Sequence, residues 1–336
     1  MTEPPGAAMM RMITGAWVAQ AVYIAARLGV ADLLAAEGPR TAEDLAARVD
    51  ADADALYRVL RALAGVGVFS EGENGAFALT PLAECLRSDV PQSQRAFAIM
   101  MGERWVWRSW GEALHSVRTG EPAFDHVYGM PLFDYYSEHP EAARVGAAGL
   151  SARSAGENAA VLAAYDFTAV DSVTDVGGGE GSLLRTVLGA HPHLRGVLFE
   201  MPHVVEMART ALVCAPEFER CEFVAGDFFS EPPPACPLLL LKKVIHDWPT
   251  ERAVTILRNC RSALPDGGRL LLVENVVVPG NEPSFGKWLD LLMLVYAGGR
   301  ERTAEEFGDL LTRSGFQMER VIPTTAGVCV IEALAA

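Results

Sequence analysis

Positive charge is scarce in this chain of 336 residues: 28 lysines and arginines stand against 43 aspartates and glutamates, a formal net charge of −15. Binding of nucleic acid without sequence preference requires clustered cations, so this balance argues against a nucleic-acid partner and against an anionic membrane surface. Long apolar runs are also missing. The longest uncharged run near the start, residues 12–26, is too short to span a bilayer and contains polar side chains. A buried or partner-facing helix is expected there.

Paired cysteines and metal-ligand spacings are absent as well. The six cysteines are scattered, without a C-x-x-C motif: Cys85, Cys214, Cys221, Cys236, Cys260 and Cys329. Scattered thiols in a chain of this length are typical of reduced, intracellular proteins. Residues 1–8 lack the basic segment and apolar core of a secretory signal peptide. We therefore expect a cytoplasmic protein and, without H-x-x-x-H or a clustered aspartate pair, no metal ion.

Apolar residues make up half of the chain, enough for a sizeable core and for more than one domain. In the second half, apolar runs typical of strands recur, with helical stretches between the first five and another helix near residues 303–314. The runs cover residues 172–176, 196–200, 221–225, 237–241, 269–274, 316–322 and 328–333. This alternation predicts an α/β fold with a doubly wound, mostly parallel, Rossmann-like sheet of seven strands, closed at one edge by a hairpin.

The N-terminal third predicts short helices followed by a two-stranded wing. Thr41 to Asp44 has the composition of a helix N-cap with an acidic first turn, and residues 65–69 and 75–79 flank a turn. A winged helix of this kind would suggest DNA recognition. Residues 27–89, however, hold six Lys and Arg against eleven Asp and Glu, and the recognition helix would begin with Asp52 and Asp54. A dimerising interaction domain is therefore the favoured interpretation.

The stretch Asp175-Val-Gly-Gly-Gly-Glu-Gly181 stands where a strand should end and a helix over residues 182–190 should begin. Consecutive glycines let the backbone approach a ligand closely, and the first N–H groups of the helix point to the same place. The dinucleotide fingerprint G-x-G-x-x-G fits poorly, because position 182 is serine. S-adenosylmethionine requires only close backbone approach and a carboxylate for its ribose. Glu200, at the end of the next strand, supplies that carboxylate.

Other polar residues follow the carboxyl ends of further strands, the edge at which ligands bind in such sheets. Gly226, Asp227 and Phe228 follow the third strand, and Lys242 follows the fourth. Asp227 is suited to accept a hydrogen bond from an adenine amine, while the Phe228 ring packs on the base.

His246, four residues after Lys242, is a candidate general base, because the imidazole pKa lies near the working pH. Carboxylates from Glu274, at the end of the fifth strand, and from Glu301 could fix its tautomer. The alternative is that His246 caps a helix starting near Pro249 and that both glutamates are surface acids. Its position at the same sheet edge as the glycine loop favours the catalytic interpretation.

Aromatic side chains are concentrated between residues 105 and 136. Core packing explains most of them, but a flat aromatic substrate would also need an apolar wall, to which rings and methionines are well suited. The expected substrate-binding residues are Met101, Trp107, Trp110, Phe133, Asp247, Met293 and Tyr296.

Four motifs in this order, Asp175-Val-Gly-Gly-Gly-x-Gly181, Gly226-Asp-Phe-Phe229, His246-Asp-Trp-Pro249 and Gly298-Gly-Arg-Glu-Arg-Thr303, give the chain its resemblance to a known family. They resemble the S-adenosylmethionine-dependent O-methyltransferases of the caffeate/hydroxyindole type, including bacterial enzymes that tailor natural products. The resemblance covers almost the whole chain. It implies a dimerisation domain over residues 1–95, a helical connector over 96–165 that contributes to the substrate pocket, and a catalytic domain over 166–336.

The resemblance also implies roles for individual residues. His246 would be the catalytic base, oriented by Glu274 and Glu301, in a metal-independent and usually homodimeric enzyme. The residues expected to hold S-adenosylmethionine, and its product S-adenosylhomocysteine, are Asp175, Gly177, Gly178, Gly179, Glu200, Met201, Gly226, Asp227, Phe228 and Lys242. Two departures are Glu200, where aspartate is commoner, and Glu180 inside the loop.

The reaction implied is methyl transfer to a hydroxyl, most simply a phenolic one, of a small aromatic secondary metabolite. Three alternatives remain open at the level of sequence. The same fold could methylate a nitrogen, could use the cofactor without methylation, as in a hydroxylase, or could serve a DNA-binding regulator. The acceptor itself cannot be named from these residues.

Overall fold

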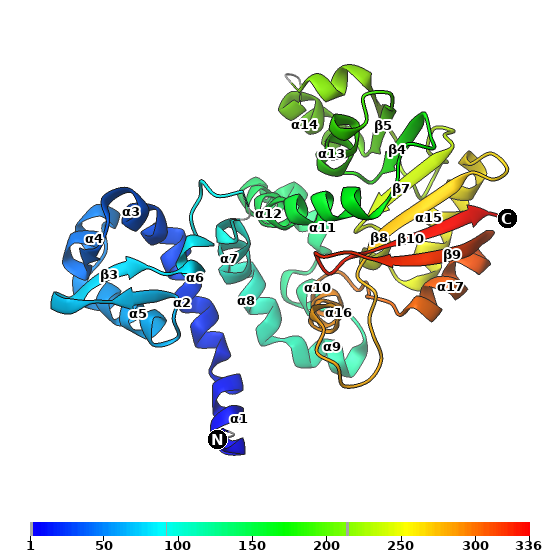
Figure 1. Cartoon of the computed structure of the whole chain (residues 1–336). Coiled ribbons are helices and arrows are strands. Elements are labelled where there is room, and N and C mark those ends of the chain that lie inside the picture. Colours follow the sequence, from blue (N-terminus) through cyan, green and yellow to red (C-terminus); the bar gives the residue numbers. More distant parts are fainter. Residues whose placement is uncertain (1–2, 92, 213–214) are drawn as a thin grey trace. The chain divides into compact units, whose positions relative to one another are not determined.

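The computed structural model describes residues 3–91, 93–212 and 215–336 and divides into two compact units (Figure 1). The first unit comprises the chain up to Arg108 together with Tyr136–Arg153. The second comprises Ser109–Tyr135 and Ser154–Ala336. The residues of the connector predicted over 96–165 are divided between the units, and the predicted domain boundaries stay predictions. Cys214 lies outside the described residues.

The first unit is mainly helical, with a small antiparallel sheet of order β1-β3-β2. Its elements are α1 (Pro5–Ile13), α2 (Gly15–Leu28), α3 (Val30–Glu37), β1 (Arg40–Thr41), α4 (Ala42–Val49), α5 (Ala53–Gly65), β2 (Phe69–Glu71), η1 (Glu73–Gly75), β3 (Ala76–Leu79), α6 (Pro81–Glu84) and α7 (Arg95–Gly102). Leu60 and Phe77 are fully buried between the helices and the wing. The helix-then-wing order predicted from the sequence is confirmed.

Local sequence explains where these elements begin and end. The Thr41 side chain accepts from the amide of Asp44, which confirms the predicted N-cap of α4. The strand expected over residues 65–69 was wrong at its start: α5 continues to Gly65 and β2 begins only at Phe69. Gly67 has φ +83°, a turn conformation that interrupts the extended backbone.

The uncharged run 12–26 forms parts of two helices, because the chain turns at Thr14 between α1 and α2. Its first half is exposed: Trp17 retains 73% of its accessible surface and Met12 retains 70%. Ala25 and Ala26, at the other end, are buried. Among the described residues no single helix has the length and apolar composition to cross a membrane, and only the bent pair α2 and α3 meets those two criteria jointly.

Helices α8 (Arg104–Gly111), α9 (Ala113–Thr119), α10 (Ala123–Tyr128), α11 (Leu132–Glu138) and α12 (Pro140–Ala164) lead into the second unit. That unit is built on seven strands in the order β6-β5-β4-β7-β8-β10-β9. The strands are β4 (Ser172–Val176), β5 (Arg195–Glu200), β6 (Cys221–Ala225), β7 (Leu238–Lys242), β8 (Arg269–Glu274), β9 (Phe316–Pro323) and β10 (Cys329–Ala335). The first five are parallel, and β10 pairs antiparallel with both β8 and β9. The doubly wound sheet with its closing hairpin is therefore confirmed.

Both faces of this sheet are covered by helices (Figure 1). The covering elements include α13 (Ser182–Ala190), α14 (Pro202–Leu212), η2 (Pro216–Arg220), η3 (Ile245–Asp247), α15 (Thr250–Ala263) and α17 (Ala304–Arg313). Helix α16 (Phe285–Tyr296) packs against α9 and α10 instead. Apolar residues of α15 and α17 pack on one face, and those of α12, α13 and α14 pack on the other. Leu238 to Leu241 are fully buried, as a strand covered on both sides requires.

One expected helix is missing from this arrangement. The sequence pattern suggested helical stretches between each of the first five strands, but residues 226–237, between β6 and β7, contain no helix. Four prolines in this segment, at positions 232, 233, 234 and 237, lack the N–H that a helix interior needs. The segment is instead an extended crossover from the edge strand β6 to the central strand β7.

Candidate active site

The loop between β4 and α13 has the conformation that its glycines permit. Gly177, Gly179 and Gly181 have φ of +68°, +58° and +73°. A Cβ added to Gly178 would lie 2.5 Å from the Asp175 carboxyl carbon, and one on Gly177 would lie 2.9 Å from a Val244 methyl. Side chains at these two positions would clash with their neighbours, whereas the space beside Gly179 is open. The loop therefore presents backbone at the carboxyl edge of the sheet.

Glu200 is directed at this loop from the end of β5. One of its carboxylate oxygens accepts from the amide of Gly179 at 3.1 Å, and the other accepts from the amide of Met201 at 2.8 Å. Asp175 is buried beneath the loop, where burial and the neighbouring Glu200 carboxylate raise its pKa to about 7. The two acids thus lie close together at the glycine loop, which we call the cradle together with Glu200 and the turn after β6.

The residues after β6 form a compact turn at the same edge. Asp227 accepts from the amide of Phe229 at 2.9 Å and from the Ser230 hydroxyl at 2.7 Å. The Phe228 ring lies 3.3 Å from where a Cβ of Gly177 would stand. The turn thus brings the Phe228 ring to the glycine loop, and the contacts of Asp227 and Phe228 with cofactor stay predictions.

Lys242 has a different environment from the other predicted cofactor residues. Its ammonium donates to Asn158 at 2.7 Å and pairs with Glu157 at 3.0 Å, both on α12. Burial lowers the pKa of Lys242, while the Glu157 carboxylate opposes that shift. The ammonium is thus committed to α12, and a contact between Lys242 and cofactor stays a prediction. Glu157 was missed by sequence reasoning, because no local pattern marks the partner of a buried lysine.

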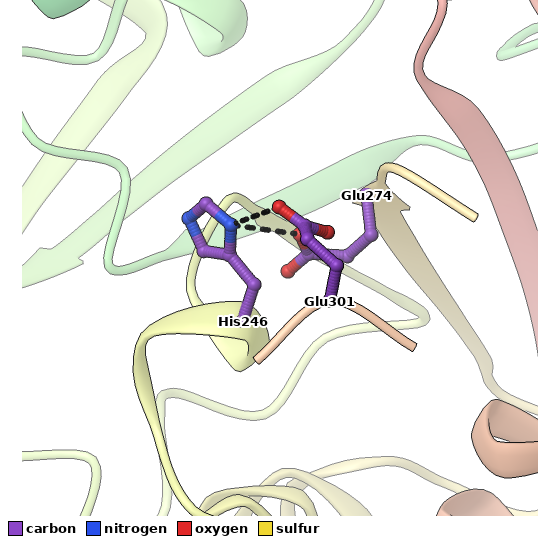
Figure 2. Close-up of side chains that lie close together, drawn as sticks. All are labelled: His246, Glu274 and Glu301. Carbon is purple, nitrogen blue, oxygen red and sulfur yellow. Dashed lines mark hydrogen bonds and ion pairs between the residues drawn. The ribbon is translucent and has the colours of Figure 1, made fainter. Parts of the chain in front are cut away.

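His246 stands in the short turn η3, where its ring meets two buried carboxylates (Figure 2). Nδ1 lies 2.7 Å from Oε1 of Glu301 and 4.0 Å from Oε2 of Glu274. Both glutamates are buried, and Glu274 also accepts from the amide of Ile245 at 3.0 Å. The structure therefore brings together the three residues predicted as catalytic. His246 does not cap the following helix, whose N-cap is Pro249.

A third carboxylate faces the other ring nitrogen. Oδ1 of Asp247 lies 3.4 Å from Nε2 of His246. Burial alone would lower the pKa of His246, but Asp247, Glu274 and Glu301 together raise it to about 9. Burial raises the pKa of Glu274 and of Asp247 in turn. We call Asp247, Glu274 and Glu301 the carboxylate shell of His246. The shell favours the protonated form of the imidazole.

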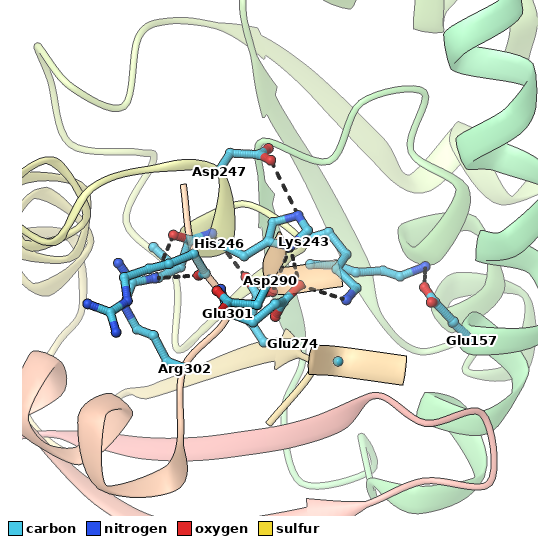
Figure 3. Close-up of polar contacts among 12 residues, drawn as sticks. Glu157, Lys243, His246, Asp247, Glu274, Asp290, Glu301 and Arg302 are labelled. Atoms are coloured by element: carbon cyan, nitrogen blue, oxygen red, sulfur yellow. Dashed lines mark hydrogen bonds and ion pairs between the residues drawn. The ribbon is translucent and has the colours of Figure 1, made fainter. Parts of the chain in front are cut away.

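The backbone of the His246 turn is fixed by the loop that carries Glu301 (Figure 3). The buried Arg302 guanidinium donates to the carbonyl of Ile245 at 3.0 Å and to that of Trp248 at 2.9 Å. The amide of Arg300 donates to the carbonyl of His246 at 2.8 Å. Arg302 was not among the predicted site residues, although it belongs to one of the four motifs.

The predicted substrate-binding residues fall into three groups. Asp247 touches His246, and the Phe133 ring stacks near Trp248, with centroids 6.1 Å apart. Met293 and Tyr296 lie one turn apart on α16, where both are buried. The remaining three are Trp110, which belongs to the second unit, and Met101 and Trp107, which belong to the first. Their contacts with substrate stay predictions.

The ligand atoms of His246, Glu274 and Glu301 all lie within 4.8 Å of one another, close enough to hold a metal ion. Sequence spacing did not indicate this group as a metal site, because its members come from η3, the end of β8 and the 298–303 loop. The hydrogen bond between His246 and Glu301 uses the same atoms. The absence of a metal from the reaction therefore stays a prediction.

Comparison with known proteins identifies a family for both the N-terminal and the C-terminal part of the chain. Residues 107–317 match the O-methyltransferase domain, and residues 10–89 match the O-methyltransferase dimerisation domain. Phenazine O-methyltransferase PhzM of Lysobacter antibioticus is 47% identical over 330 residues, 98% of this chain and 96% of that protein. The 8-amino-8-demethylriboflavin N,N-dimethyltransferase of Streptomyces davaonensis is 37% identical, over 94% of this chain and 91% of that protein.

A solved structure adds ligands to the comparison. The O-methyltransferase NcsB1 from neocarzinostatin biosynthesis, crystallised with S-adenosylmethionine and 2-hydroxy-5-methyl naphthoic acid, matches with a TM-score of 0.81 and 34% identity, over 95% of this chain and 96% of that one. The glycine loop, the histidine with its carboxylates and these matches lead to one conclusion: the chain is a methyltransferase that belongs to the O-methyltransferase family.

Proposed function

We propose that the protein transfers a methyl group from S-adenosylmethionine to a phenolic hydroxyl of a small aromatic natural product, with His246 as the general base. The observation that carries this proposal is the buried ring of His246, whose Nδ1 is held 2.7 Å from Glu301 at the sheet edge that bears the glycine loop. With Nδ1 engaged, Nε2 is left to face the acceptor. A base fixed in this way is what deprotonation of a hydroxyl requires.

The residues of the cradle fit the cofactor. The glycine loop suits close approach of a nucleoside, because the space beside Gly179 is open and its φ of +58° favours a residue without a Cβ. Glu200 offers a carboxylate for ribose hydroxyls. Asp227 and Phe228 would hold the adenine. When bound there, S-adenosylmethionine supplies an electrophilic methyl group on a sulfonium centre.

The roles of the chain's own residues follow from their contacts. Nε2 of His246 would take the proton of the acceptor hydroxyl, and Glu301 and Glu274 would stabilise the resulting imidazolium. The Asp247 carboxylate, 3.4 Å from Nε2, would move aside so that the acceptor hydroxyl could approach this nitrogen. A free phenol, with a pKa of about 10, is mostly protonated at neutral pH, so a base is needed.

The names of the relatives support an aromatic acceptor, but they do not agree on the acceptor atom, since one acts on an amino group. N-methylation of an aromatic amine is therefore the second candidate. It differs in needing no strong base, so loss of His246 would be tolerated. We also propose that the protein is a homodimer formed through residues 10–89 and that it acts in the cytoplasm.

The test is His246→Ala, assayed with labelled S-adenosylmethionine against phenols, catechols, naphthoates and phenazine hydroxides. We expect turnover to fall by about 10²–10⁴-fold while affinity for S-adenosylhomocysteine stays unchanged. His193→Ala is the matched control, because this exposed histidine precedes β5 at the amino edge of the sheet. Unchanged turnover in His246→Ala would remove His246 from the mechanism. A product one oxygen heavier, with no added methyl group, would instead identify a hydroxylase.

A further inference from the structure

Lys243 has an unusual backbone conformation for its residue type. It follows β7 directly and has φ +56°, in the left-handed region. The other non-glycine residues described in that region are Asp50 and Asn74, whose short polar side chains tolerate it better than lysine does. The Lys243 amide donates to the carbonyl of Val273 at 3.0 Å, which holds this conformation in place. A strained residue beside an active site calls for a functional explanation.

The side chain of Lys243 runs to the carboxylate shell (Figure 3). Its ammonium lies 4.0 Å from Oε1 of Glu301, the same oxygen that lies 2.7 Å from Nδ1 of His246. Only 19% of the side chain is exposed, and the ammonium has no hydrogen-bond partner among the described residues. One carboxylate oxygen thus stands between an imidazole and an ammonium.

Near His246, acidic groups outnumber the cations that are available to balance them. The charged and titratable groups around Lys243 are Asp247 on η3, Glu274 on β8, Glu301 and Arg302 on the 298–303 loop, Asp290 on α16, Lys242 on β7 and Cys329 on β10. Arg302 is committed to backbone carbonyls and Lys242 to Glu157. Asp290 accepts from the amide of Glu301 and so adds a further acid.

We propose that Lys243 is a positioning residue for His246, whose ammonium holds the Glu301 carboxylate beside Nδ1 and offsets part of the negative charge of the shell. The left-handed turn is needed because it directs the lysine side chain toward Glu301 from the end of β7. This inference rests on the proposed role of His246 as the base, since Lys243 would set the pH at which the His246 imidazole loses its proton.

The sign of the effect follows from the charges. Removing a cation from beside three carboxylates makes the group of His246 and its shell bind protons more strongly, so the apparent pKa of the group should rise. The ammonium lies 4.0 Å from the carboxylate oxygen that is itself 2.7 Å from Nδ1. With an effective dielectric constant of about 20, a charge this close accounts for a shift of about one to two pH units. Activity at neutral pH would then fall by about tenfold or more and would return at higher pH.

The experiment compares Lys243→Asn with the unaltered enzyme. Asparagine tolerates positive φ, so the variant removes the charge without adding backbone strain. Lys243→Arg keeps the charge and should keep the pH profile. Arg195→Gln is the matched control, because it removes one positive charge from an exposed position at the amino end of β5.

Two readouts separate this inference from the proposed function. The pKa of His246 is measured directly by NMR of the labelled imidazole, assigned with His246→Gln, and kcat/KM is measured across the same pH range. A rise of about one unit or more in the NMR titration of Lys243→Asn, absent in Lys243→Arg and Arg195→Gln, supports the inference even if kcat/KM does not follow. An unchanged NMR titration overturns it, whatever His246→Ala shows.

Discussion

The carboxylate shell makes a strong prediction about pH. Because the pKa of His246 is raised from 6.5 to about 9, its imidazole keeps a proton throughout the neutral range, and the base form appears only as pH rises through about 9. About 1% of the free enzyme carries the neutral ring at pH 7. We therefore expect kcat/KM to rise roughly tenfold per pH unit below the apparent pKa and to level off above it.

Glu301→Gln tests the origin of this shift. The substitution keeps an oxygen near Nδ1 but removes the charge that lies 2.7 Å away. Loss of an adjacent opposite charge should lower the pKa of His246 by about 1–3 units. The acidic limb of the kcat/KM profile should therefore shift to lower pH by that amount. The plateau at high pH should also fall, because an amide does not stabilise the imidazolium that forms during the reaction.

The assay is initial-rate measurement with labelled cofactor from about pH 6 to about pH 10, with thermal unfolding followed at each pH so that inactivation is not mistaken for titration. Glu305→Gln, an exposed acid on the neighbouring α17, is the control. A flat kcat/KM profile for the unaltered enzyme would refute the reasoning. So would a Glu301→Gln profile whose acidic limb coincides with that of Glu305→Gln.

Three further predictions concern the cofactor cradle, a metal ion and the guanidinium of Arg302. Asp227→Ala should weaken S-adenosylhomocysteine binding by about tenfold or more in calorimetric titration, whereas Ser230→Ala, which removes one hydrogen bond of the turn, should weaken it less. Exhaustive chelation should leave turnover unchanged, and a loss restored by added divalent metal would contradict the hydrogen-bonded assignment of His246 and Glu301. Arg302→Met leaves two buried carbonyls without their donor and should destabilise the fold by about 2–4 kcal/mol, measured by urea unfolding.

Much of the catalytic unit could be predicted from the sequence because its signals are local. Apolar runs bounded by glycine, proline and charged residues located all seven strands, and β4, β6 and β8 begin and end where expected. A parallel sheet then brings the carboxyl ends of its strands to one edge. That rule alone brings the glycine loop, His246 and Glu274 into one region before any coordinate is known.

The unpredicted features depend on contacts between segments distant in sequence. Glu157 pairs with Lys242 from a helix 85 positions earlier in the chain. Lys243 lies 4.0 Å from Glu301 and has a left-handed backbone conformation, which its residue type disfavours. The helix expected before β7 is absent for a local reason, since four prolines between β6 and β7 lack the N–H that a helix interior needs.

A base with a pKa of about 9 at first seems badly matched to neutral pH, yet the energies favour it. Moving a proton from a phenol of pKa about 10 to an ordinary imidazole of about 6.5 is uphill by some 3.5 units, or about 5 kcal/mol. Transfer to His246 is uphill by about one unit, or about 1.4 kcal/mol, after a cost of about 2.7 kcal/mol to free the ring at pH 7. The summed free-energy cost is therefore similar for the two bases. With His246, however, most of that cost lies in deprotonating the free enzyme, and less lies in the proton transfer from the phenol. kcat/KM should therefore depend on pH more steeply than on the acidity of the phenol.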